Sequence, residues 1–166
     1  MAKIASDAAY HVVGILGDST NGLGPLVAEF ALEAALSEPA LTASHILPRN
    51  VSPEIEEKTT GAAYPTFQVY CEKVRNELRE KFRTFSGTAR IVVEVRASQD
   101  RLENLEQRLG IYVDAVTAVL DASRGDWGLG MYYTGGYDIA IGAVRTGGRN
   151  LLQIAKVSFD VQVSRD

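Results

Sequence analysis

Apolar residues near the start of the chain recur at the three- and four-residue spacing of one helix face. These positions are Ala9, Val12, Val13 and Leu16. Ser6 or Asp7, just before them, suits a helix N-cap, and the glycine-rich stretch that follows ends the pattern. Pro25 favours a first helical turn, and a second apolar face continues from it. We therefore expect residues 1–41 to form an N-terminal helical segment with two short helices.

Residues 42–64 show neither helical nor alternating periodicity. The stretch contains Pro48, Pro53 and Gly61, with only scattered apolar residues between them. A connection longer than about 15 residues without regular structure is uncommon in a compact domain, and is usually functional or disordered. We expect an ordered, extended arm whose apolar side chains dock on another surface.

Alternating apolar and polar residues predict two strands after Pro65. The first covers residues 66–71 and the second residues 89–96, each with its apolar side chains on one face. The intervening residues 73–87 fit a helix or a hairpin, because their apolar positions allow both. The run from Phe82 to Phe85 suits extended structure, so a hairpin is the structure we predict.

The clearest helix in the sequence begins after Asp100. Asp100 and Glu103 have the spacing of a capping box, so we expect the helix to start there. Its apolar stripe consists of Leu102, Leu105, Leu109, Tyr112, Val113, Val116 and Leu120. Gly125 is expected to close the last turn in a left-handed conformation. This stripe predicts that the helix covers one face of the sheet.

Two further alternating segments, residues 137–144 and 155–163, flank a Gly-Gly pair and predict a hairpin. The resulting order is helices, arm, two strands, helix and two strands. It predicts one α+β domain over residues 1–166, with a small antiparallel or mixed sheet of about four strands and helices packed on one face. Residues 65–166 hold the sheet and the long helix.

Composition narrows the classes of function. With 17 basic and 21 acidic residues, the formal charge of -4 provides no global positive field for nucleic acid. Cys71 is the single cysteine, and no secretory signal precedes the first helix, so we expect a reducing cytoplasm during assembly. No apolar run approaches the roughly 20 residues of a membrane span. We therefore expect no membrane association.

Residues that could support catalysis do not form a recognisable site in the sequence. The glycine-rich stretch 14–24 lacks the lysine of a phosphate-binding loop, and Cys71 lies on an apolar strand face. His11 and His45 show no metal-ligand spacing. Acids on the long helix, among them Glu106 and Asp114, keep a small enzyme open as an alternative, but surface charges of a helix are the commoner finding. We expect no catalytic residue, no cofactor and no metal ligand.

Two clusters could make contacts with partners. The segment 73–90 is locally basic but interleaved with Glu72, Glu77 and Glu80, so it fits either nucleic-acid binding or a subunit contact. Aromatic residues crowd the glycine-rich stretch 125–137, where they either cap the core or form a contact surface. They are Trp127, Tyr132, Tyr133 and Tyr137.

Several short sequences resemble bacteriophage tail terminator proteins, the family that completes tails and joins them to heads. The resemblance covers about the C-terminal two thirds of the chain. It rests on the stretch Glu80–Thr88, the strand Ile91–Arg96 and the helix after Asp100, together with loop sequences. The loops are Arg124-Gly125-Asp126-Trp127, Tyr133-Thr134-Gly135-Gly136-Tyr137 and Gly147-Gly148-Arg149-Asn150.

This resemblance implies a structural virion protein rather than an enzyme. It implies a ring, usually of six copies, that caps the tail tube, stops its polymerisation and binds a neck or head-completion protein while viral DNA passes through. Another head-to-tail connector is the nearest alternative. The arm, residues 42–64, and the hairpin, residues 73–87, are the expected contact regions. Candidate interface residues are Arg75, Arg79, Lys81, Arg83, Trp127, Tyr132, Tyr133 and Arg149.

Overall fold

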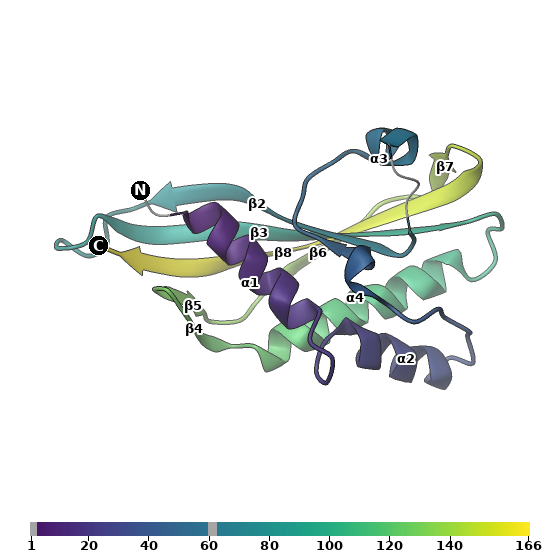
Figure 1. The fold of residues 1–166 in the computed structure, drawn as a ribbon, viewed down its shortest axis with the longest axis horizontal. Coiled ribbons are helices and arrows are strands. Elements are labelled where there is room, and N and C mark those ends of the chain that lie inside the picture. Colours follow the sequence, from purple (N-terminus) through teal and green to yellow (C-terminus); the bar gives the residue numbers. More distant parts are fainter. Residues whose placement is uncertain (1–2, 60–62) are drawn as a thin grey trace.

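The computed structural model describes residues 3–59 and 63–166, and it combines helices with one large sheet (Figure 1). The helices are α1 (Ile4–Leu16), α2 (Leu23–Glu33), α3 (Pro53–Thr59) and α4 (Leu105–Ala122), with a 3-10 turn at Ala43–His45. The strands are β1 (Ile46–Leu47), β2 (Thr66–Asn76), β3 (Phe85–Gln99), β4 (Gly125–Gly128), β5 (Met131–Tyr133), β6 (Asp138–Ile141), β7 (Arg145–Gly147) and β8 (Asn150–Arg165). The mixed α and β class is therefore confirmed.

The sheet is larger than the sequence predicted. In the described residues it has eight strands. Six follow the order β1-β2-β3-β8-β5-β4, and β6 and β7 also pair with β8. Only β1 and β2 run parallel; the other pairs in the described chain are antiparallel. The four predicted strands correspond to β2, β3, β6 and β8. The prediction of about four strands was wrong because β1, β4, β5 and β7 have only two to four residues, too few for alternation to show.

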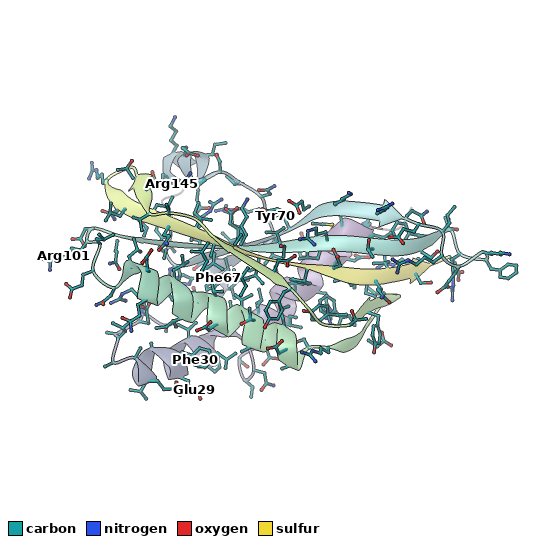
Figure 2. The ribbon with its side chains drawn as sticks, turned by 180° about the vertical axis from the view of Figure 1, so that it is seen from behind. Glu29, Phe30, Phe67, Tyr70, Arg101 and Arg145 are labelled. Carbon is teal, nitrogen blue, oxygen red and sulfur yellow. The ribbon has the colours of Figure 1, made fainter. Side chains whose placement is uncertain are left out.

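α1 and α4 cover one face of the sheet, and α2 packs against α4 (Figure 1). Alternate residues of the long central strands β3 and β8 are fully buried there, among them Ile91, Val93 and Val157. Figure 2 shows Phe67 of β2 directed into this layer and Tyr70 on the opposite side of the sheet. The ring of Phe67 meets that of Tyr112 of α4 edge-on at 6.0 Å. The apolar core thus lies between the sheet and α1 and α4, and α2 extends it on the outer side of α4.

The short helix α3 lies on the other face, which corrects the expectation that all helices pack on one side. Its Glu56 accepts hydrogen bonds from Thr66 and Gln68 of β2, whose side chains point away from the core layer. Residues 42–64 were predicted as an arm without regular structure. The 3-10 turn, β1 and α3 contradict that prediction in the described part of the arm, while residues 60–62 lie outside the described residues.

The apolar stripe of α4 is confirmed, but the predicted ends of the helix were wrong. Leu105, Leu109 and Leu120 are buried, whereas Leu102 precedes the helix and is exposed. The N-cap is Asn104 at φ 64°, and no side chain caps it. Gln99 instead donates its side-chain amide to the carbonyl oxygens of Arg101 and Glu103.

The other helix ends also differ from the sequence predictions. α4 ends at Ala122 and Gly125 opens β4 at φ 123°, so this glycine does not close the helix. α1 begins at Ile4, before both predicted caps, and its Asp7 is paired with Arg165 at the other end of the chain (2.9 Å). α2 begins two residues before Pro25, which keeps that proline in the first turn, as predicted.

Candidate assembly surface

The predicted hairpin is confirmed and forms one end of the molecule. β2 and β3 pair from Thr66↔Arg96 to Asn76↔Gly87, and residues 77–84 connect them. Figure 1 shows this end of the sheet reaching past the helices, close to the chain's C-terminus. The side-chain oxygen of Asn76 accepts hydrogen bonds from the backbone N–H groups of Leu78 (3.2 Å) and Ser86 (3.1 Å). The tip is therefore held in shape by its own side chains.

Acidic groups of the same chain pair with two of the predicted basic residues at the tip. Arg79 contacts Glu77 at 2.6 Å, and Arg83 contacts Asp166 at 2.7 Å. The hydrogen bond to Asp166 is the main reason why the pKa of Arg83 lies above its ordinary value. Arg75 and Lys81 are exposed on the same end. The tip is a mixed-charge surface rather than a uniform basic patch, and this weakens the nucleic-acid alternative.

Large apolar side chains accompany these charges. Phe82 is 97% exposed and Leu78 is 61% exposed. A phenylalanine side chain gains about 1.5–3 kcal/mol when it moves from water into an apolar environment. None of the described residues supplies that environment at the hairpin tip, so burial of Phe82 requires a partner.

The aromatic cluster divides between the core and the surface. The Trp127 ring stacks on His11 of α1 with centroids 4.4 Å apart, and its Nε1–H donates to the carbonyl oxygen of Ser123 (2.7 Å). Tyr133 is fully buried, its hydroxyl donates to the Gly136 carbonyl oxygen (2.9 Å), and burial raises its pKa to about 12. Both residues therefore cap the core. The prediction that Tyr133 lies in an interface is wrong, and Tyr132 is the exposed residue of the pair.

The structure separates the predicted interface residues into two groups. Tyr132 pairs with Gln162, on the half of the sheet that ends in the hairpin. Arg149 is exposed in the turn between β7 and β8, at the far end of the sheet. The β3–β8 ladder runs between these ends from Phe85↔Arg165 to Gln99↔Leu151. At about 3.4 Å per residue, the ends lie on the order of 45 Å apart, so the two groups occupy opposite ends of the sheet.

Two arginine clusters on the face opposite the core were missed by the sequence reasoning. Arg90 of β3 contacts Glu72 (3.4 Å), Asp138 (3.3 Å) and Asp160 (3.3 Å), each on a different strand. Six residues further along β3, Arg96 contacts Glu56 (3.1 Å) and Glu94. Neither cluster has a sequence pattern, because its members are brought together only by strand pairing and by α3.

The Arg96 cluster attaches the arm to the sheet. Arg96 also donates to the carbonyl oxygen of Val51, and Glu56 receives a second arginine, Arg49, at 3.1 Å. The backbone N–H of Val51 donates to the side-chain oxygen of Gln68 (2.9 Å). These contacts satisfy the charged groups from several sides, which is the arrangement expected of a structural ion network.

The candidate catalytic groups stay dispersed. Asp114 is exposed on α4, and Glu106 accepts a hydrogen bond from Gln153 (3.4 Å). Burial raises the pKa of the Cys71 thiol, and burial lowers the pKa of His11, which stacks on Trp127. A raised thiol pKa disfavours the nucleophilic thiolate. Within residues 3–59 and 63–166, no group of three or more His, Cys, Asp or Glu residues is placed to hold a metal ion.

No protein-family model and no curated protein matches the chain. Across the part of the chain that the structure describes, no helix has both the length and the apolar content needed to cross a bilayer.

Proposed function

We propose that this chain is a structural subunit that assembles with copies of itself into a ring, as a bacteriophage tail terminator does. In this role the ring, of six copies in the family it resembles, caps the tail tube and stops its polymerisation. It also binds the neck or head-completion protein on its other side. The subunit belongs to the virion, and viral DNA passes through the ring without being held.

The observation that carries the proposal is the hairpin end of the sheet. It presents an almost fully exposed Phe82 and an exposed Leu78 among paired charges. Exposed aromatic residues are typical anchors of protein interfaces, and charges around them set orientation and partner choice. Because the tip is fixed by internal hydrogen bonds, it offers a defined shape to a partner at little cost in ordering.

The charge balance supports a role beside DNA rather than on it. The chain has a formal charge of -4, and Arg79, Arg83 and Arg90 all face acids of the same chain. Such a surface does not release counterions from phosphates and so does not retain the nucleic acid. Free passage of DNA is what a terminator ring requires.

Tube length provides the direct test. The tail tube protein of the same phage is polymerised with and without this chain, and tube lengths are measured by electron microscopy. We expect wild-type chain to stop growth and to appear as a cap at one tube end. Phe82→Ser together with Leu78→Ser is expected to abolish capping, whereas the matched control Leu102→Ser, exposed but outside the hairpin, is expected to cap normally.

The same experiment separates the terminator from the connector alternative. Rings that bind the portal side of heads and leave tube length unchanged would identify another head-to-tail connector. Chains that neither form rings nor bind tubes or heads would overturn the proposal.

A further inference from the structure

Strand β6 forms an open edge of the sheet. It pairs with β8 through Asp138↔Ser158 to Ile141↔Ala155, and its other side pairs with no strand of the described residues. Ile139 is 45% exposed and Ile141 is 60% exposed. Proteins commonly protect exposed edges with lysine, proline or a bulge. β6 has no lysine, proline or bulge; its only protection is its length of four residues and one acidic residue, Asp138, which leaves Ile139 and Ile141 as apolar side chains at the edge.

The backbone of β6 has hydrogen-bonding groups directed outward. The N–H of Gly142 donates to the carbonyl oxygen of Ile154 at 2.9 Å, next in register after Ile141↔Ala155. In an antiparallel ladder such bonded positions alternate with positions whose N–H and C=O point to the other side. The backbone N–H and C=O groups of Asp138 and Ala140 therefore point toward β8, while those of Ile139 and Ile141 point outward and are available to a further strand.

A second open edge lies on the opposite side of the same sheet. β1 covers β2 only at Phe67 and Gln68, so the outer side of β2 from Tyr70 to Asn76 pairs with no described strand. The N–H of Glu77 donates to the Ser86 carbonyl oxygen (3.1 Å), and the same alternation turns the N–H of Val74 outward. Lys73 and Arg75 are exposed beside it, whereas β6 carries Asp138.

Strand directions decide how these two edges fit. β2 and β3, β3 and β8, and β8 and β6 are each antiparallel, so β6 runs opposite to β2. A second copy of the chain in the same orientation would thus place its β2 antiparallel to the β6 of the first. We infer that β6 of one copy pairs with the outer edge of β2, residues 70–76, of the next, so that the sheet continues from subunit to subunit.

The pairing is of the head-to-tail kind from which a closed ring can be built. It joins unlike surfaces of identical subunits, and such contacts form a ring when the rotation closes. Followed across β8 and β3, β6 is in register with residues 67–70 of β2. The outer side of β2 is already occupied by β1 at Phe67 and Gln68, so the β6 of another copy cannot pair there. The next copy is therefore shifted along the strands by four to five residues, roughly 15 Å, and a stagger of this kind is what closing a sheet on itself requires.

The inference rests on the assembly role proposed above, and its test uses the purified full chain. Ile139→Pro removes an outward N–H and leaves the donors of Asp138 and Ala140 to β8 intact; Val74→Pro does the same for β2. Native mass spectrometry over a concentration series is expected to show wild-type oligomers and monomers for each variant alone. Ile139→Ala, which keeps the N–H, is expected to retain oligomers.

Mixing the two proline variants gives the decisive result. Each keeps one competent edge, so the mixture is expected to form a 1:1 dimer and nothing larger. Hydrogen exchange should slow at residues 139–141 of one chain and 72–75 of the other. Monomers in the mixture, a wild-type chain that stays monomeric at every concentration, or Ile139→Pro rings overturn the inference, and circular dichroism verifies that both variants fold.

Failure of this inference is distinguishable from failure of the proposed function. If the Ile139→Pro and Val74→Pro variants each still form rings that cap tubes, the terminator role stands and the edge pairing is wrong. Edge-paired oligomers that neither cap tubes nor bind heads would leave the pairing intact and remove the terminator role.

Discussion

Arg90 and Arg96 lie on the same strand and the same face of the sheet, and both are surrounded by carboxylates, yet they differ in burial. The side chain of Arg96 is 2% exposed, and its partners Glu56 and Glu94 are 1% and 8% exposed. The side chain of Arg90 is 32% exposed, and its three partners are 55–81% exposed. The difference arises because α3 and the arm cover only the Arg96 end.

This contrast assigns different roles to similar clusters. A buried ion pair is strongly destabilised when one partner is removed, because the remaining charge stays out of water. Exposed pairs contribute little, since water solvates each partner and salt screens the attraction. The Arg96 cluster therefore fixes the fold, while the Arg90 cluster, which includes Asp138 of β6, stays solvated at its end of the face.

The largest expected effect comes from breaking the buried cluster. Arg96→Ala leaves Glu56 and Glu94 buried without their main counter-charge, so we expect a loss of about 3–5 kcal/mol in the free energy of unfolding. Urea unfolding followed by circular dichroism measures it. A change below about 1 kcal/mol would show that water reaches this cluster and that the two arginines are alike.

A cavity made in the apolar core, on the helix-covered face, gives a second loss of stability with which the effect of Arg96→Ala can be compared. Leu105→Ala is expected to destabilise the protein by about 2–4 kcal/mol, because Leu105 is 1% exposed and packs in the core. The same urea titration applies. An unchanged midpoint would contradict the packing of α4 on the sheet, and with it the division into an apolar face and an ionic face.

Removing Arg90 is expected to have a much smaller effect. Arg90→Ala should reduce the free energy of unfolding by about 0–1 kcal/mol, since its partners are largely solvated. Raising the salt concentration should diminish the difference from wild type further. A loss in the free energy of unfolding as large as that of Arg96→Ala would show that the Arg90 cluster stabilises the fold. Asp138 would then be needed within the subunit rather than free at its surface.

The smallest expected effect on stability concerns the hairpin tip. Arg79→Glu combined with Arg83→Glu should leave the midpoint of thermal unfolding nearly unchanged, because the two side chains are 49% and 42% exposed and pair only at the surface. The same double variant is expected to fail in tube capping, since reversed charges oppose the partner that the wild-type tip fits. A lowered midpoint would assign these arginines to folding, and normal capping would exclude them from assembly.

The sequence by itself determined the elements whose pattern is local and repeated. α1, α4, β2, β3 and β8 are long enough for their apolar residues to recur several times, so periodicity located them. Alternation did not decide residues 73–87, whose apolar positions also fit a helix; strand pairing shows the hairpin there. Helix ends were less predictable, since a single residue such as Asn104 in a left-handed conformation decides where a helix begins.

Only the tertiary structure decided which side chains meet and which stay exposed. Tyr132 and Tyr133 are neighbours of the same type, and the pleat of β5 buries one and exposes the other. Arg90 and Arg96 are indistinguishable along β3 until α3 covers one of them. The open edges of β2 and β6 likewise depend on which strands pair. These properties arise from contacts between residues far apart in the chain, whose pairing no local pattern specifies.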